Sequence, residues 1–431
     1  MIYFIYLLYF IIYKIIYYVI YKKMKEKIKI LVIPSDRSGC GYFRSVQPHQ
    51  FIAENYSDKF HIDIMYEFPQ DQQLDKFLQQ YDILHVHKQL DKECKIISLA
   101  KFLGLKVIID VDDYWDLGND HPMSISAKQQ NWKEPIINHV KLADYVTTTT
   151  EIFKNTIKPF NSNVLVFPNA IDPTEEQFIP KPTYSDKLRF GIICGSSHEK
   201  DIEILRGMVA SLPQEIINQV QFVLCGFDTR GRMTTFNPMT NETKIRDILP
   251  EESVWYRYEK IITNDYKIIS PQHKEFLLKF VSQTEYPNTN ESYRRCWTKD
   301  ISEYATHYNN IDVLLVPLKE NKFNAQKSQL KVIECGFFHK AIIAQNFGPY
   351  QLDLVPMIEK GGNINENGNA LLVDSSKNHK LWAKYITKLV KDRSLVTKLQ
   401  ENLYNTVKDK YSLKTVCEQR VKEYLKIMGR E

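Results

Sequence analysis

Three ionisable side chains recur at helical spacing in the stretch FNAQKSQLKVIECG, residues 323–336. In a helix, Lys327, Lys331 and Glu334 would lie in one narrow arc beside the apolar stripe that begins at Leu330. A lysine and backbone amides at the amino end of a helix can hold a diphosphate, and a carboxylate two turns on can accept two hydrogen bonds from a ribose diol. Taken alone, the same residues would make an ordinary charged face of a surface helix.

The elements that must position this stretch are two sets of short apolar segments that alternate with helical ones. The segments are rich in β-branched residues and bounded by turns, which is typical of parallel strands buried on both faces. The first set of predicted strands covers residues 28–33, 82–87, 106–113, 144–150 and 163–169, and the second covers 187–195, 220–227, 311–318, 340–346 and 370–374. Predicted helices include about 199–211, 299–308, 328–335 and 378–392. A proline-rich segment at 167–186 separates the two sets and predicts a linker.

This alternation predicts an α/β protein of two doubly wound, Rossmann-like domains that face a cleft. The predicted domains are 24–180 and 187–395, the second with an elaboration at 228–297, and the helical residues 396–431 close the chain. With 431 residues, 43% of them hydrophobic, the chain can supply two cores. Ligands of such sheets bind outside the carboxyl ends of the strands, so the residues that follow strands are the candidates for chemistry.

Polar residues follow the predicted strands of the first domain. Gly41, in the turn CGYFR, permits close approach of the backbone to a ligand, and Arg44 is one helical turn further on, on the acceptor side. The alternatives are a plain strand-to-helix turn and a solvated arginine. His87 and Asp112, at strand tips, could orient or deprotonate an acceptor hydroxyl, and Asp113 begins the next loop. These acids could also be hydrogen-bonded loop residues or metal ligands, but no second cluster with ligand spacing accompanies them, so we expect no metal site.

The first strand of the second domain ends in a similar cluster. Gly195 and Ser196 follow the strand, and a helix begins at His198. Backbone amides, a hydroxyl and an imidazole therefore gather where a phosphate could lie. The alternative is a helix cap with no ligand.

Charge and cysteine content narrow the function classes. Lys plus Arg number 57 against 52 Asp plus Glu, a net charge of +5 that is spread along the chain. Such mild basicity suits a diphosphate ligand and is too weak and diffuse to indicate a nucleic-acid partner. The seven cysteines are scattered and include no CxxC pair, which indicates a reducing compartment and no structural zinc.

The first 23 residues differ from the rest. They are almost wholly apolar apart from Lys14 and turn basic at Lys22 and Lys23. One interpretation is a membrane span that places the rest of the protein in the cytoplasm, and a second is an anchor in the membrane interface. A third is that translation begins at Met24, so that the segment is upstream sequence read in frame.

The chain also resembles a known family. FNAQKSQLKVIECG, with YNNIDVLLVPL before it and FGPY and NGNALLVD after it, resembles the carboxyl-terminal domain of GT-B glycosyltransferases, most like glycosyltransferase family 4. CGYFRSVQP, DILHVHKQ, VDVDDYWD and ADYVTTTTEIFKN resemble the amino-terminal domain of bacterial and phage-type members. The resemblance covers roughly residues 27–425 and implies a GT-B fold whose last helix crosses back onto the first domain.

The resemblance implies a retaining, metal-independent transferase without a cofactor, which moves a hexose from a UDP- or GDP-sugar to a hydroxyl of a glycan, lipid or protein. Glu334 would bind the donor ribose, while the first glutamate of the family signature falls here on Gln326. Asn324 and Lys327 are the nearest substitutes beside the sugar, and Lys327 would stabilise the leaving diphosphate. The implied donor-binding set is Gly41, Gly195, Ser196, His198, Lys327, Ser328, Lys331 and Glu334.

Two functions of other classes compete with this interpretation. Because Gln326 replaces a family glutamate, the chain could be a carbohydrate- or nucleotide-binding protein on a GT-B scaffold, without turnover. A nucleotide-sugar epimerase would need no acceptor and would differ in its product. Fold alone does not choose between these functions.

Overall fold

The computed structural model describes residues 26–37, 39–67, 73–88, 95–119, 121–181, 183–237, 239–240, 242–279, 284–359, 361–375 and 377–430. The apolar segment 1–23 and the alternative start at Met24 lie outside the described residues. No helix among the described residues is long and apolar enough to cross a membrane.

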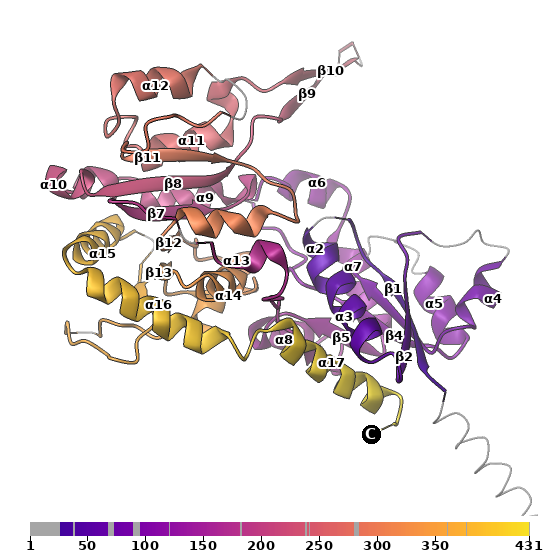
Figure 1. Cartoon of the computed structure of the whole chain (residues 1–431). Coiled ribbons are helices and arrows are strands. Elements are labelled where there is room, and N and C mark those ends of the chain that lie inside the picture. Colours follow the sequence, from indigo (N-terminus) through magenta and orange to yellow (C-terminus); the bar gives the residue numbers. More distant parts are fainter. Residues whose placement is uncertain are drawn as a thin grey trace, which may run out of the picture. The chain divides into compact units, whose positions relative to one another are not determined.

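The chain divides into two compact units (Figure 1). The first unit comprises the described residues of Met1–Trp115, Gln130–Pro168 and Leu413–Glu431, and the second comprises those of Asp116–Gln129 and Asn169–Ser412.

The first unit is built on a six-stranded parallel sheet with the strand order β2-β1-β3-β4-β5-β6. Its strands are β1 (Ile28–Ile33), β2 (Phe60–Ile64), β3 (Ile83–His87), β4 (Lys106–Asp110), β5 (Tyr145–Thr148) and β6 (Val164–Val166). Its helices are α2 (Gly39–Gly41), the π-helix η1 (Tyr42–Val46), α3 (Gln47–Asn55), α4 (Leu74–Leu78), α5 (Lys95–Phe102), α7 (Lys133–Leu142), α8 (Glu151–Ile157) and α17 (Leu413–Ile427). All five residues of β3 are buried, as expected for a parallel strand covered on both faces.

The last helix of the chain, α17, belongs to the first unit and packs beside α3 (Figure 1). The Tyr424 hydroxyl lies 2.8 Å from Nε2 of His49, and the buried Arg420 guanidinium stacks 4.5 Å from the centre of the Phe167 ring. This return of the last helix to the first unit confirms the sequence prediction.

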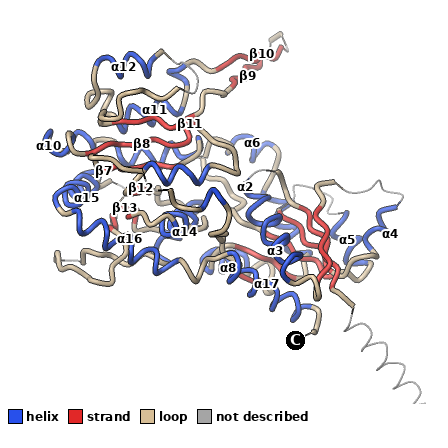
Figure 2. The backbone as a smooth tube through the Cα atoms, viewed as in Figure 1, coloured by secondary structure: helices blue, strands red, loops and turns tan. Residues whose placement is uncertain are grey.

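The second unit holds a six-stranded parallel sheet with the order β11-β8-β7-β12-β13-β14. Its strands are β7 (Leu188–Ile193), β8 (Val220–Phe227), β11 (Tyr293–Trp297), β12 (Val313–Val316), β13 (Ala341–Gln345) and β14 (Leu371–Val373). A separate antiparallel hairpin, β9 (Arg232–Asn237) and β10 (Glu242–Asp247), extends away from this sheet (Figure 2).

The α-helices of the second unit are α6 (Ser124–Gln129), α9 (Glu199–Ile202), α10 (Gln214–Ile217), α11 (Val254–Ile262), α12 (Pro271–Leu278), α13 (Lys322–Ala325), α14 (Leu330–Phe337), α15 (His379–Lys391) and α16 (Arg393–Val407). Its 3₁₀ helices are η3 (Glu176–Phe178), η4 (Ser196–His198), η5 (Glu203–Leu205), η6 (Val209–Ser211), η7 (Pro250–Glu252), η8 (Tyr304–Asn310) and η9 (Gly348–Leu352). The core packs the apolar faces of the helices, such as Trp382 on α15, onto strand residues such as Phe190 and Phe222.

The stretch 323–336 is not one helix, contrary to the arc proposed from the sequence. Helix α13 ends at Ala325 and α14 begins at Leu330, so Lys327 lies in the connection rather than on the edge of α14. Local side-chain bonds define α13 as a short helix of its own: the Asn321 side chain caps its start by accepting from the Asn324 amide, and the Asn324 side chain donates back to the Lys319 carbonyl. Such bonds offer the backbone an alternative to a continuous helix.

Three other expectations about elements need correction. The predicted helix at 199–211 is divided into α9, η5 and η6, and Gly207 between the last two has φ +88°, which does not continue a helix. The sheet of the second unit also contains β11, which lies inside the predicted elaboration 228–297 and pairs with β8. The sheet of the first unit contains β2 in addition to the five segments identified from the sequence.

Candidate functional site

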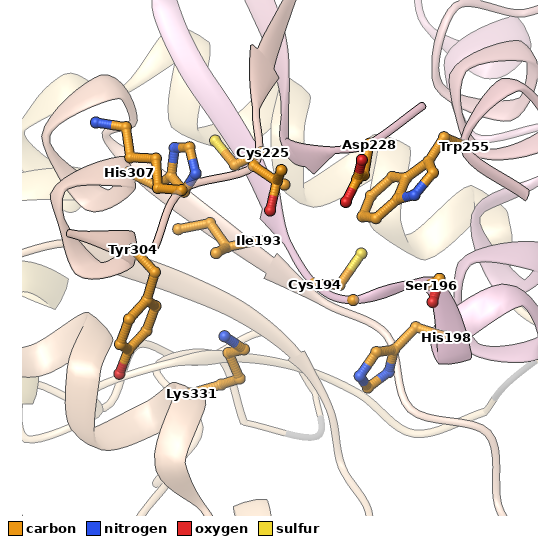
Figure 3. Close-up of a pocket in the computed structure, with 14 residues that line it drawn as sticks. Ile193, Cys194, Ser196, His198, Cys225, Asp228, Trp255, Tyr304, His307 and Lys331 are labelled. Carbon is orange, nitrogen blue, oxygen red and sulfur yellow. The ribbon is translucent and has the colours of Figure 1, made fainter. Parts of the chain in front are cut away.

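A pocket of about 410 Å³ opens where β7, β8 and β11 end, at the carboxyl edge of the second unit's sheet (Figure 3). Its wall includes Gly195 and Ser196 after β7, Asp228 after β8, and Thr298 and Lys299 after β11. Four further side chains reach it from other elements, namely Trp255 on α11, Tyr304 and His307 on η8, and Lys331 on α14. This is the place where the ligands of doubly wound sheets bind.

Two glycines set the shape of the pocket floor. Gly226 has φ +99°, and a Cβ there would lie 2.7 Å from the Cys194 carbonyl oxygen, so a larger residue would push the ends of β7 and β8 apart. At Gly195, by contrast, a Cβ would meet nothing within 4 Å, because the residue faces the open pocket. One glycine is therefore required for folding, and the other leaves room for a ligand.

A buried aspartate organises the end of the pocket that contains His198. Asp201 accepts from the Lys319 amide at 2.7 Å and from the Asn324 side chain at 3.0 Å, and its Oδ2 lies 2.8 Å from Nδ1 of His198. Burial lowers the pKa of His198 and nearby Lys327 lowers it further, while Asp201 opposes the shift. A neutral His198 that donates from Nδ1 to Asp201 keeps Nε2 as an acceptor.

Glu334 is fully buried and is held inside the unit. Its carboxylate accepts hydrogen bonds from the Tyr304 hydroxyl at 2.5 Å and the Tyr308 hydroxyl at 2.7 Å, and it lies 3.4 Å from Nζ of Lys331. Of these partners, Tyr304 and Lys331 line the pocket. Glu334 thus orients two pocket groups, a contact that the sequence did not reveal, and its own bond to a ribose stays a prediction.

Helix α14, which carries Glu334 and Lys331, is held in place by its packing against α16. Gly336 on α14 sits against α16, where a Cβ would lie 2.5 Å from the Val407 side chain. Close approach of the two helices therefore fixes where α14 presents Lys331 to the pocket.

The structure brings four predicted donor-site residues to the pocket wall: Gly195, Ser196, His198 and Lys331. Three other predicted residues lie nearby but outside this wall. Asn324 is buried against Asp201, the Lys327 ammonium lies 5.3 Å from the centre of the Phe323 ring, and the Ser328 hydroxyl accepts from the Asn169 side chain at 3.0 Å. The predicted roles of these residues on the sugar and the diphosphate stay predictions.

In the first unit, Arg44 is buried. Its guanidinium donates twice to Asp110, at 3.0 Å and 2.6 Å, and once to the Phe167 carbonyl at 2.6 Å. Burial alone would raise the pKa of Asp110, but Arg44 outweighs it and holds the pKa below its usual value. The guanidinium is bonded to the carboxylate at the tip of β4, which excludes the alternative of a solvated arginine, and the predicted acceptor-side role of Arg44 stays a prediction.

His87 and Asp112 do lie together, as the sequence analysis proposed for the tips of their strands. Nε2 of His87 is 3.3 Å from Asp112, while its Nδ1 is 2.9 Å from the Ser35 hydroxyl. Lys88 contacts Asp112 at 2.6 Å and the more exposed Asp113 at 3.6 Å. Burial raises the pKa of Asp112, but Lys88 and His87 more than offset this and hold it well below its usual value. The His87 ring is itself fully buried, so its roles and those of both acids stay predictions.

Gly41 lies in the same unit, at the turn after β1. Its amide donates to the Asp36 side chain at 3.2 Å, and a Cβ would lie 2.1 Å from the Asp36 carbonyl oxygen. The glycine is therefore required for the local turn, and its predicted contact with a donor stays a prediction.

Several pocket residues were not identified from the sequence: Asp228, Thr298, Lys299, Tyr304 and His307. Asp228 follows the predicted strand 220–227, so the carboxyl-end rule already applied to it, whereas Thr298 and Lys299 follow β11, which lies in the segment 228–297 that was not assigned a strand of the main sheet. Tyr304 and His307 precede β12 on a 3₁₀ helix and carry no recognisable motif.

The α11 segment mainly contributes to the core. Glu259 accepts from Arg295 at 2.9 Å and 2.8 Å and from the hydroxyls of Tyr266 and Tyr293, all of them buried. Trp255 alone of the aromatic residues on α11 lines the pocket. Among the described residues no group of three or more His, Cys, Asp or Glu side chains is arranged to hold a metal ion.

Comparison with known proteins shows the fold. No protein-family model and no curated protein matches the sequence. A glycosyltransferase from Rickettsia africae is similar in structure, with a TM-score of 0.57 at 12% identity over 94% of this chain and 100% of that one. HepE from Anabaena in complex with UDP-glucose gives a TM-score of 0.56 at 12% identity over 92% of this chain and 99% of that one.

A third similar structure is an α-glucosyltransferase in complex with UDP-glucose and DNA containing an abasic site, with a TM-score of 0.52 at 12% identity over 93% of this chain and 100% of that one. At this level of identity the likeness concerns the fold alone. The two parallel sheets and the returning last helix match GT-B glycosyltransferase structures, which confirms the GT-B fold predicted from the sequence.

Proposed function

We propose that the protein is a glycosyltransferase that moves a sugar from a nucleoside-diphosphate-sugar to a hydroxyl of an acceptor. The observation that carries this proposal is the pocket at the carboxyl edge of the second sheet. There Lys331, His198 and the turn at Gly195 and Ser196 surround a space of about 410 Å³ on a GT-B fold. A cation, a hydroxyl and turn amides on one side of a pocket suit a diphosphate.

In this proposal each pocket group has a defined task. Lys331 neutralises charge on the diphosphate as the bond to the sugar breaks, and the Ser196 hydroxyl supplies a further donor. Glu334 keeps Lys331 and Tyr304 in place through its buried carboxylate. Retention of the anomeric configuration, independence of a metal and membership of family 4 belong to the proposal and rest on the sequence resemblance. So do the predicted roles of Asn324 and Lys327 beside the sugar.

The proposed acceptor is a glycan, lipid or protein hydroxyl, and the proposed location is the cytoplasm or the cytoplasmic face of a membrane. These proposals rest on the mild, dispersed charge, the scattered cysteines and the apolar segment at the start of the chain. A UDP- or GDP-sugar is the proposed donor, without a further cofactor.

The test is a turnover assay with the full-length chain. The protein is incubated with UDP-, GDP-, ADP- and CMP-sugars, with and without a mixture of sugar acceptors, and the released nucleotide and the sugar product are measured by chromatography. We expect one donor to release nucleotide, and Lys331→Met to slow the release by roughly tenfold to a hundredfold, as loss of a charged hydrogen bond predicts. Lys391→Met, which changes an exposed lysine at the end of α15, is the matched control.

The outcome also separates the competing functions. Nucleotide binding without release of sugar would favour a binding protein without turnover, the alternative that Gln326 suggests. Conversion of one nucleotide-sugar into another without an acceptor would favour an epimerase. No binding and no turnover with any donor, from a folded protein, would contradict the proposal.

A further inference from the structure

His307 differs from the other polar groups of the pocket. It lies on η8, is only 2% exposed and lines the pocket, yet neither of its ring nitrogens has a hydrogen-bond partner among the described residues. His198 and Tyr304, in contrast, are bonded to Asp201 and Glu334. Buried polar groups are almost always bonded, so an imidazole that lacks a protein partner at the wall of a pocket indicates that a ligand supplies one.

The position of His307 fits one part of a nucleotide-sugar. Lys331 and His198 lie on one side of the pocket, and His307 and Cys225 lie across it from them (Figure 3). If the diphosphate lies at the side of Lys331, a group across the pocket meets a different part of the ligand. Cys225 lies beside His307, while Asp228 and Trp255 lie further along the pocket wall (Figure 3). A thiol and an indole along this wall are suited to a flat, weakly polar ring.

The protonation state of His307 agrees with this placement. Burial, together with the nearby charges of Lys299, Lys331 and Arg294, lowers the pKa of His307 to about 4. The ring is therefore neutral near pH 7 and offers one N–H donor and one acceptor nitrogen. A phosphate oxygen can only accept, so it would use half of this pair. The edge of a nucleobase carries both donors and acceptors and can use the whole pair.

We propose that His307 hydrogen-bonds the nucleobase of the donor and is a specificity-determining residue of this site. The proposal rests on the proposed function, because it assigns a part of the same pocket to a part of the same ligand. A site built to hydrogen-bond a particular group discriminates strongly against ligands that lack it, since its buried polar atoms are then left unpaired.

The experiment measures dissociation constants by isothermal titration calorimetry for the full-length chain with UDP, GDP, ADP, CDP and inorganic pyrophosphate. The variants are His307→Phe, which keeps a flat ring without hydrogen bonds, and His307→Gln, which keeps a donor and an acceptor. We expect wild type to prefer one base. His307→Phe should weaken the preferred nucleotide by roughly tenfold to a hundredfold and leave pyrophosphate within about twofold. His307→Gln should keep more of the affinity than His307→Phe.

Two results would overturn the inference while leaving the proposed function intact. One is a wild type that binds all four nucleoside diphosphates equally, and the other is a His307→Phe variant with unchanged affinity and unchanged base ranking. Failure of wild type to bind any nucleotide would instead contradict the proposed function itself.

A second measurement covers the case in which the phenylalanine variant does not fold. In wild type labelled with ¹⁵N-histidine, the ring nitrogens of His307 should shift when the preferred nucleotide is added and stay in place with pyrophosphate; the His307→Gln spectrum assigns the signals. Saturation with nucleotide and no change at His307 would contradict the inference.

Discussion

The carboxyl edges of the two sheets present similar residue types but use them differently. In the first unit, Arg44 is bonded to Asp110, and Lys88 is bonded to Asp112. In the second unit, Lys331 is a quarter exposed at a pocket and His307 has no bonded partner among the described residues. Polar residues near the carboxyl ends of the strands are thus bonded inside the protein in one unit and line a pocket in the other.

Whether a charged side chain at a sheet edge is bonded inside the protein depends on whether a neighbouring element supplies a group of opposite charge. The π-helix η1 brings the Arg44 guanidinium onto Asp110. Loss of one charge of such a buried pair lowers the free energy of unfolding, and a charge that is bonded inside the protein is not available to a ligand. At the second edge the buried carboxylates, Asp201 and Glu334, bond hydroxyl, amide and imidazole groups that line or support the pocket. We therefore expect loss of Arg44 at the first edge to change stability and loss of Lys331 at the second to change ligand binding.

The largest effect should come from breaking the buried ion pair of the first unit. Arg44→Met leaves Asp110 charged and buried, so we expect the free energy of unfolding to fall by about 3–5 kcal/mol. Arg257→Met is the matched control, because its pair with Glu199 is partly exposed and should contribute less than about 1 kcal/mol. Urea unfolding followed by circular dichroism measures both. Equal losses in the two variants would contradict the internal role of Arg44.

The next effect concerns stability as a function of pH. The pKa of His307 is about 4 in the folded protein and about 6.5 in an unfolded chain. Above pH 6.5 the ring is neutral in both states, and as the pH falls towards 4 the unfolded state takes up the proton first, so stability is lost. Wild type should lose up to roughly 3 kcal/mol more than His307→Gln between pH 7 and pH 4. If the free energies of unfolding of the two proteins fall equally between pH 7 and pH 4, the lowered pKa of His307 is ruled out.

A smaller loss is expected from the glycine that the second sheet requires. Gly226→Ala places a methyl group 2.7 Å from the Cys194 carbonyl at a φ of +99°. The free energy of unfolding should fall by roughly 1–3 kcal/mol, the usual cost of such backbone strain. The change is measured by thermal and urea unfolding. An unaltered midpoint would show that β7 and β8 can separate at no cost.

The smallest change in stability should come from Gly195→Ala. The added methyl group meets no atom within 4 Å and projects into open space, so the free energy of unfolding should change by less than about 0.5 kcal/mol. The methyl group narrows the pocket, however, and nucleotide binding should weaken. Urea unfolding measures the stability of the variant, and calorimetry measures its nucleotide affinity. A variant that unfolds at a lower urea concentration than wild type, or that binds nucleotide as tightly, would contradict the placement of Gly195 at the ligand.

Much of this arrangement follows from the sequence because the controlling signals are local. Buried parallel strands need continuous apolar segments, so most of the strands and the two doubly wound domains were predictable, and the carboxyl-end rule located Gly195, Ser196 and His198. The GT-B fold was implied by the resemblance to a known family. The break before α14 was not predictable from periodicity, because the spacing of Lys327, Lys331 and Glu334 fits one continuous helix.

Other parts of the site depend on contacts between distant residues. Tyr304 became part of the site through its bond to Glu334, which lies 30 positions further along the chain. The partner that removes Arg44 from the surface, Asp110, is 66 positions away. Neither pairing leaves a spacing pattern in a single sequence.

The most direct test of the account is a calorimetric titration of the full-length chain with nucleoside diphosphates, in wild type, in Lys331→Met and in the control Lys391→Met. The account predicts that wild type and the control bind one nucleotide with the same affinity, while Lys331→Met remains folded and binds it roughly tenfold to a hundredfold more weakly. Equal binding by all three proteins, or no binding by folded wild type, would contradict the assignment of this pocket to the donor.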